Sequence, residues 1–147
     1  MKIVFASSNP HKVTEVNQKL GSEFTIIGLH DLGFDEEIEE NGSTLVANAQ
    51  IKARCIWKRF QMDCFADDTG LMVDALNGAP GVLSARYAGP QRSAEDNMKK
   101  LLVELADQEV RTARFQTAIC LILDGHEFLF EGIVEGHIAK SPQGDGG

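Results

Sequence analysis

Two adjacent carboxylates close a short apolar run in the stretch FADDTG at residues 65–70. Side chains alternate between the two faces of a β-strand, so neighbouring aspartates normally point apart. Asp67 and Asp68 can serve one site only if the strand ends there, and Thr69-Gly70 predicts such a break because glycine accepts backbone angles that other residues resist. Paired carboxylates at a strand end suit a hard divalent cation, such as Mg²⁺, that also holds phosphates. A solvated turn is the alternative, because aspartate is common in turns.

A second polar stretch follows the first apolar run, residues 2–6, which predicts a buried strand. Hydroxyls, backbone N–H groups and one cation come together in Ser7, Ser8, Asn9, Pro10, His11 and Lys12. Asn9 suits an N-cap and Pro10 the first helical position, so we predict a helix from here to a stop at Gly21. A helix N-terminus beyond the carboxyl end of a strand is a natural anion site. Plain N-capping is the alternative.

Five further side chains share a bias toward phosphate or metal: Glu39, Glu40, Asn48, Lys52 and Arg86. The two glutamates precede a Gly-Ser-Thr turn, and an acidic surface loop is the alternative for them. The asparagine and the lysine follow Thr44 at steps of four along a predicted helix, so the solvated side of that helix is their alternative. The arginine could be a surface residue, and Lys12 could simply form an intrahelical ion pair with Glu15.

Strand and helix patterns interleave along the rest of the chain. Further strands are predicted at 24–29, 63–67, 71–74, 113–123 and 127–138, and further helices at about 44–60 and 93–105. Asp124-Gly125 is typical of a hairpin turn between the last two strands. This order predicts a single α/β domain with a mixed sheet over residues 1–147.

The composition restricts the class of protein. Hydrophobic residues make up 43% of the 147 residues, which suits one soluble domain with a real core. The net charge of −8 argues against a broad nucleic-acid surface, because phosphate backbones require a basic patch. A small phosphorylated substrate remains possible, because a metal and a few Lys or Arg side chains can invert the local field. The chain has no Gly-x-x-x-x-Gly-Lys loop, no His-Glu-x-x-His and no Gly-x-Ser-x-Gly elbow.

Cysteine usage and apolar run lengths address the compartment. Cys55, Cys64 and Cys120 are odd in number and widely spaced, so buried free thiols are expected. No apolar run approaches the roughly 20 residues of a membrane span, and the apolar part of residues 1–5 is too short for a signal peptide. We therefore expect no membrane partner and a cytoplasmic location.

Three spaced blocks carry a resemblance to a known family. They are Ser7-Ser8-Asn9-Pro10-His11-Lys12 with Glu15; Glu40, Gly42, Thr44, Asn48-Ala49 and Lys52-Ala53; and residues 66–87, from Ala66-Asp67-Asp68-Thr69-Gly70 to Ser84-Ala85-Arg86-Tyr87. In this order and spacing the chain resembles the inosine/xanthosine triphosphate pyrophosphatases, Ham1-like enzymes that remove non-standard purine nucleotides.

The resemblance implies Mg²⁺-dependent hydrolysis of dITP, ITP or XTP to the monophosphate and pyrophosphate, usually by a homodimer. It implies an elongated mixed β-sheet flanked by helices, with two lobes and a central cleft. Asp68 would be the general base or a metal-linked carboxylate, with Glu39 as a further metal ligand and Glu40 and Asp67 as secondary candidates. Residues 7–12 would hold phosphates and Thr69 would touch the substrate. Asn48, Lys52 and Arg86 complete the set of substrate-binding candidates.

The resemblance departs from the family pattern at Pro142-Gln143-Gly144-Asp145-Gly146-Gly147. In the family this loop continues into Phe-Gly-Tyr-Asp, then a later Lys, then Ser-His-Arg. We therefore expect the domain at 1–147 to lack the family's C-terminal segment, which supplies much of the purine-base pocket. The alternative function is a catalytically impaired nucleotide-binding or oligomerising remnant.

Overall fold

A computed structural model of the chain describes residues 1–143, so residues 144–147 of the loop predicted from Pro142 onward lie outside the described residues. Its strands are β1 (Lys2–Phe5), β2 (Thr25–Ile27), β3 (Cys64–Val73), β4 (Pro80–Gly81), β5 (Thr112–Leu123) and β6 (His126–His137). Its helices are α1 (Pro10–Leu20), α2 (Leu45–Phe60) and α3 (Ala94–Glu104), with short 3₁₀ helices at His30–Leu32, Asp74–Leu76 and Ser84–Arg86.

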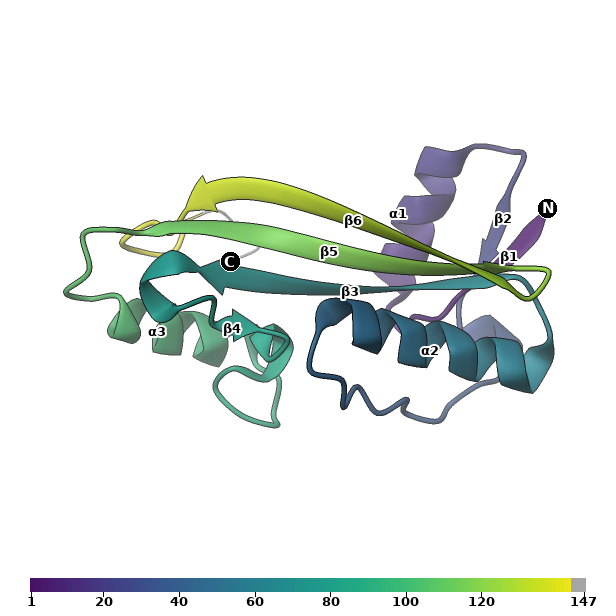
Figure 1. The fold of residues 1–147 in the computed structure, drawn as a ribbon, viewed down its shortest axis with the longest axis horizontal. Helices are drawn as coiled ribbons and strands as arrows, with labels where there is room; N and C mark the ends of the chain where they lie inside the picture. The colour runs from purple at the N-terminus through teal and green to yellow at the C-terminus, as the bar shows by residue number, and fades with distance from the viewer. Residues whose placement is uncertain (144–147) are drawn as a thin grey trace. The chain divides into compact units, whose positions relative to one another are not determined.

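The strands form one six-stranded mixed sheet in the order β2-β1-β3-β5-β6, with β4 paired to β3 (Figure 1). β1 runs parallel to both β2 and β3, whereas β3 and β4 are antiparallel. Asp124 and Gly125 make the two-residue turn between β5 and β6, and both have positive φ, as a hairpin of this length requires. The predicted α/β class and mixed sheet are confirmed.

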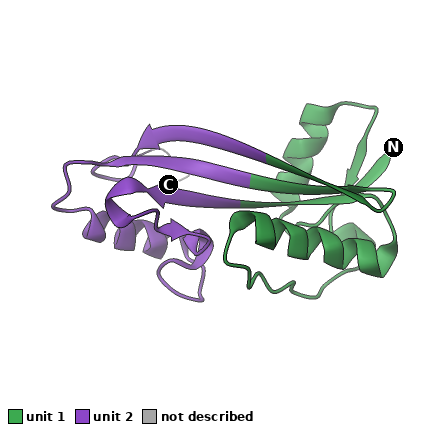
Figure 2. Ribbon diagram, viewed as in Figure 1, with its two compact units in different colours: residues 1–68, 118–130 green, residues 69–117, 131–147 purple. Residues whose placement is uncertain are grey.

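The chain folds into two compact units that interleave along the sequence (Figure 2). Unit 1 comprises residues 1–68 and 118–130, and unit 2 comprises residues 69–117 and those from 131 onward. Strands β3, β5 and β6 contribute residues to both units.

In unit 1, two helices bury apolar side chains against the sheet. Ile3, Phe5 and Ile26 form a cluster to which α1 contributes Val13 and Val16. The helix begins as predicted, because the Asn9 side chain accepts a hydrogen bond from the His11 N–H at 2.9 Å. On α2 the buried residues are Leu45, Asn48, Ala49, Ala53 and Ile56. Small alanines at the contact allow the helix backbone to lie close to β3.

In unit 2, α3 closes a second core. Leu101 of this helix and Leu105 at its C-cap pack with Val73 of β3 and Ala113 of β5. Ser93 caps the helix by accepting a hydrogen bond from the backbone N–H of Asp96 at 3.2 Å, as its position in the sequence indicates. The N-terminal boundary of this helix is therefore predictable from its cap.

The predicted strand break after Asp68 is wrong. β3 runs without interruption from Cys64 to Val73, through Thr69 and Gly70. Glycine permits unusual backbone angles but does not impose them, and Gly70 does not adopt a positive φ. The two segments predicted at 63–67 and 71–74 are one strand, so the side chains of Asp67 and Asp68 alternate between its faces.

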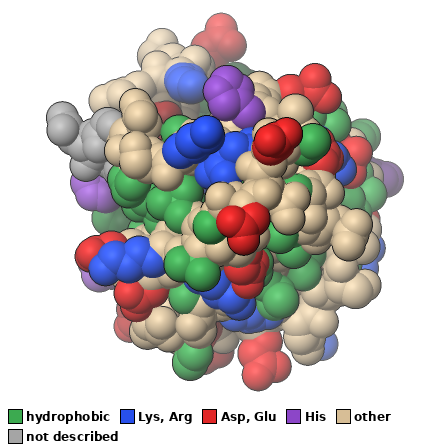
Figure 3. Space-filling model, turned by 90° about the vertical axis from the view of Figure 1, so that its left-hand side faces the viewer, with side chains coloured by type: hydrophobic (Ala, Val, Ile, Leu, Met, Phe, Trp, Pro, Cys, Tyr) green, Lys and Arg blue, Asp and Glu red, His purple; other side chains and the backbone are tan. Residues whose placement is uncertain are grey.

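The surface carries no single-sign patch on the face shown in Figure 3, where acidic, basic and hydrophobic side chains are interspersed. The edge strand β6 is exposed along its whole length and presents large apolar side chains to solvent. They are Phe128, Leu129, Phe130, Ile133 and Val134. Within residues 1–143, no helix combines the length and apolarity needed to span a bilayer.

Candidate active site

The two aspartates of β3 face different helices of unit 1. Asp67 shares its face with Phe65, which packs against the cluster that includes α1. Asp68 shares its face with Cys64, whose thiol donates a hydrogen bond to the Ala53 carbonyl of α2 at 3.3 Å. The two carboxylates therefore do not lie side by side in one site, and each has its own partners.

Asp67 forms an ion pair with Lys12, the lysine of the segment 7–12 that is predicted to bind an anion. Lys12 Nζ lies 3.3 Å from Asp67 Oδ2, so the alternative of an intrahelical pair with Glu15 is not what the structure shows. The Lys12 side chain is 46% exposed, against 18% for Asp67. An exposed ammonium in the first turn of α1 adds to the positive end of the helix dipole.

The loop before α1 has the geometry of a helix cap. Ser7 Oγ accepts a hydrogen bond from the Asn9 N–H at 3.1 Å, while Ser8, Asn9, Pro10 and His11 are exposed. N-capping by Asn9 is thus real. The cap uses only some of the N–H groups at this end of the helix, so others are free to bind a phosphate. Phosphate binding by residues 7–12 remains a prediction.

A cavity of about 650 Å³ lies beside this loop and is lined by Ser7, Ser8 and Pro10. The same cavity is also lined by Asp31, Asp35 and Glu36. Three carboxylates repel a phosphate, so an anion is favoured at the Lys12 side of the loop rather than inside this cavity.

Asp68 is half-buried, and Asn48 Nδ2 donates a hydrogen bond to its Oδ2 at 3.0 Å. Burial raises the pKa of Asp68, and the charges of Glu40 and Asp67 add to that rise. The hydrogen bond from Asn48 and the charge of Lys52 lower the pKa and oppose it. A carboxylate with a raised pKa is a better proton acceptor than an ordinary exposed aspartate.

Lys52 connects the acidic loop to β3. Its Nζ lies 2.9 Å from Glu40 Oε1 and also donates a hydrogen bond to the backbone carbonyl of Asp67. The Lys52 side chain is 13% exposed, and Asn48 is 1% exposed. The polar stripe predicted on this helix is therefore not its solvated side. It faces β3, where the carboxylate of Asp68 and the backbone carbonyl of Asp67 accept hydrogen bonds from Asn48 and Lys52.

The remaining acidic candidate, Glu39, is exposed on the loop before α2. Within residues 1–143, no three His, Cys, Asp or Glu side chains are placed to hold a metal ion. Mg²⁺ commonly binds through one or two carboxylates, water and substrate phosphates, without an all-protein cage. Asp68 and the nearby Glu40 offer carboxylate oxygens, the donor type that Mg²⁺ accepts.

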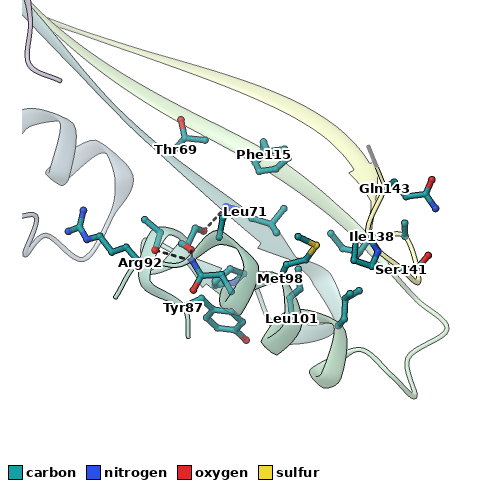
Figure 4. Close-up of a pocket in the computed structure, with 18 residues that line it drawn as sticks. Thr69, Leu71, Tyr87, Arg92, Met98, Leu101, Phe115, Ile138, Ser141 and Gln143 are labelled. Atoms are coloured by element: carbon teal, nitrogen blue, oxygen red, sulfur yellow. Dashed lines mark hydrogen bonds between the residues drawn. The ribbon is translucent and has the colours of Figure 1, made fainter. Parts of the chain in front are cut away.

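Two candidates belong to unit 2. Thr69 Oγ1 lies 2.8 Å from Thr117 Oγ1 and borders a cavity of about 660 Å³ with largely apolar walls (Figure 4). Arg86 is half-buried at the end of a 3₁₀ helix. Asn97 of α3 fixes that turn by donating hydrogen bonds to the carbonyls of Ser84 at 3.3 Å and Ala85 at 3.0 Å.

Sequence reasoning missed two contributors to these sites. One is Asn97, whose position in α3 gave no signal. The other is Gly42, whose N–H donates a hydrogen bond to Asn48 Oδ1 at 2.8 Å. A glycine six residues before a polar helix position was visible in the sequence, but nothing there showed that the asparagine is buried.

Known proteins share this sequence along its length. The model of the Ham1 family matches residues 3–147. The chain belongs to the Ham1 family. The resemblance in the three sequence blocks is thereby confirmed.

Individual relatives of this Ham1 chain extend the comparison. A protein of Flavobacterium psychrophilum named dITP/XTP pyrophosphatase is 48% identical over 147 residues, which are 100% of this chain and 77% of the relative. Its Bacillus subtilis namesake is 43% identical over 98% of this chain and 75% of its own length. The solved structure of the Staphylococcus aureus Ham1 protein superposes with a TM-score of 0.89 at 38% identity, covering 100% of this chain and 77% of that one.

Proposed function

We propose that this chain hydrolyses non-standard purine nucleoside triphosphates, such as dITP, ITP and XTP, to the monophosphate and pyrophosphate. One observation carries the proposal: the half-buried Asp68 accepts a hydrogen bond from Asn48 of α2, and Lys52 of the same helix donates to the backbone carbonyl of the adjacent Asp67. Phosphoryl chemistry requires a proton acceptor beside positive charge. The relatives named dITP/XTP pyrophosphatase support the substrate class.

In this mechanism Asp68 orients the attacking water and accepts its proton. The hydrogen bond from Asn48 uses Oδ2 of Asp68, and within residues 1–143 Oδ1 accepts no hydrogen bond that would keep water away. Lys12, half exposed at the start of α1, neutralises charge on the phosphate chain. Lys52 holds Glu40 toward β3 through their 2.9 Å ion pair.

We propose Mg²⁺ as the cofactor, with Asp68 and Glu39 as its main ligands and Glu40 as a secondary one. Asp67, on the other face of β3 and paired with Lys12, is left out of this set. When bound, Mg²⁺ supplies charge neutralisation along the triphosphate. The net charge of −8 supports a requirement for a cation, because it would otherwise repel the substrate. Residues 7–12, Thr69, Lys52 and Arg86 remain proposed substrate contacts.

We also propose a homodimer that works in the cytoplasm, where nucleoside triphosphates are made and used. The exposed apolar side chains of the edge strand β6 support an interface between copies. The net charge of −8 supports a protein that binds neither nucleic acid nor anionic membrane.

Pyrophosphate release from dITP, XTP, dATP and dGTP, measured with and without Mg²⁺, tests the proposal. We expect kcat/KM for dITP and XTP to exceed that for dATP and dGTP at least tenfold, and release to require Mg²⁺. Binding of dITP without turnover would instead support the nucleotide-binding remnant. Equal turnover of all four nucleotides would reject the proposed selectivity.

A further inference from the structure

Asn48 is the only fully buried polar side chain among residues 1–143, at 1% exposure. A buried amide is costly unless its polar atoms are hydrogen-bonded. Both ends of this amide are satisfied: Oδ1 accepts from the Gly42 N–H at 2.8 Å, and Nδ2 donates to Asp68 Oδ2 at 3.0 Å. The amide therefore joins three segments, namely the loop before α2, α2 itself and β3.

The orientation of the amide follows from its partners. The Gly42 N–H can only donate, so it must meet the carbonyl oxygen of Asn48. The ionised carboxylate of Asp68 can only accept, so it must meet the amide nitrogen. No other residue of this size offers one donor and one acceptor in this arrangement, because aspartate lacks the donor and leucine lacks both.

Gly42 gives an independent sign that this contact is tight. A Cβ at this position would lie 2.7 Å from Asn48 Oδ1 and 2.8 Å from the Ala47 Cβ. Gly42 has no positive φ, so its backbone is open to other residues. The glycine is therefore required by the close approach of the loop to Asn48 and not by a special backbone angle.

We propose that Asn48 is a positioning residue, which holds the carboxylate of Asp68 and the segment 39–42 in one fixed arrangement. Its burial keeps it away from substrate, so this role replaces the substrate contact predicted from sequence. The consequence for catalysis rests on the function proposed above, in which Asp68 and the glutamates of that segment act on one substrate.

The two hydrogen bonds of Asn48, to Gly42 and Asp68, form a clamp. Two variants break this clamp, and a third provides a matched control. Asn48→Ala removes both hydrogen bonds, and Gly42→Ala forces the loop away while keeping every polar side chain. Asn17→Ala removes a comparable two-bond clamp, since Asn17 donates to the Ile26 carbonyl at 2.9 Å and accepts from the Ile26 N–H at 2.8 Å. That clamp joins α1 to β2 and touches no candidate site residue.

Steady-state turnover of dITP at saturating Mg²⁺, well below the unfolding temperature of each variant, separates positioning from general weakening. We expect kcat to fall at least tenfold in Asn48→Ala and Gly42→Ala, with KM for dITP changed less than threefold. Asn17→Ala should keep kcat within twofold of the wild type although it lowers the unfolding temperature. Unchanged kcat in both clamp variants, or an equal loss in the control, would overturn the proposal.

Hydrogen exchange of the Gly42 amide provides a readout without metal or nucleotide. We expect a protected amide in the wild type and in Asn17→Ala, and at least tenfold faster exchange in Asn48→Ala. Unchanged protection in Asn48→Ala would overturn the clamp. A wild-type chain that turns over no nucleotide would reject the proposed function alone, and the clamp would then be judged by this exchange.

Discussion

In the proposed mechanism, Asp68 serves chemistry at the expense of stability. Its pKa is raised mainly by burial, so the ionised carboxylate is less favourable in the folded chain than in the unfolded one. An asparagine at this position keeps an oxygen to accept the hydrogen bond from Asn48 and removes the buried charge. Activity and stability should therefore change in opposite directions on substitution.

We predict that Asp68→Asn lowers kcat/KM for dITP by about 10² to 10⁴, the usual contribution of a general base. The variant should be more stable than the wild type at pH 7. That difference should shrink as the pH falls through the folded pKa of Asp68, where the wild type becomes neutral as well. Urea unfolding across pH, beside the pyrophosphate assay, measures both. A less stable variant at pH 7 would contradict this account of the buried charge.

Glu127 has a pKa shift opposite in direction to that of Asp68. Arg54 donates hydrogen bonds to its carboxylate at 2.7 and 2.9 Å, and chiefly for that reason the pKa of Glu127 is lowered from 4.5. The ion pair therefore contributes stability at neutral pH that is lost as the pH falls through the folded pKa. We predict that Glu127→Gln lowers the unfolding free energy at pH 7 by about 1 kcal/mol or less, since the pair is partly exposed. The loss should vanish at a pH below that pKa; a loss independent of pH would indicate packing instead.

Buried thiols provide a further residue-scale prediction. Burial raises the pKa of Cys64 to about 11 and that of Cys120 to about 12, so neither carries thiolate at pH 8. In the native protein we expect neither to react with a thiol reagent such as DTNB at pH 8, whereas all three cysteines react after denaturation. Mass mapping of modified sites identifies which cysteine reacts. Rapid native labelling of Cys64 or Cys120 would show that this core opens.

At the scale of elements, helix starts were predictable and side-chain surroundings were not. Asn9 and Ser93 announce α1 and α3 because capping is a local interaction between near neighbours. The break expected in β3 failed because Gly70 can follow either conformation, and pairing with β4 keeps this part of the strand extended. The residues around Gly70 do not reveal that β4 pairs with this part of β3.

The helix α2 shows the same limit within one element. Steps of four in the sequence correctly placed Asn48 and Lys52 on one stripe. Whether that stripe meets water depends on β3, which brings Asp68 and the Asp67 carbonyl to it. The pattern thus predicted that the two side chains share a stripe, and only the tertiary structure supplied their hydrogen-bond partners.

At the scale of the whole molecule, β6 offers the test of assembly. An exposed edge strand with five large apolar side chains is a site for association. We predict a dimer by sedimentation at micromolar concentration, and a monomer for Ile133→Glu. The control Val103→Glu changes a side chain that is 75% exposed on α3 and should leave the dimer intact. A monomeric wild type, or dissociation by both substitutions, would contradict a β6 interface.

The identity of the products tests the central claim most directly. Phosphorus NMR of a dITP and Mg²⁺ reaction distinguishes cleavage between the α- and β-phosphates from cleavage of the terminal phosphate. We predict dIMP and pyrophosphate in equal amounts with the wild-type chain, and formation of both at least about 10²-fold slower with Asp68→Asn. Formation of dIDP and orthophosphate, or equal product formation by the variant, would contradict a pyrophosphatase that depends on Asp68.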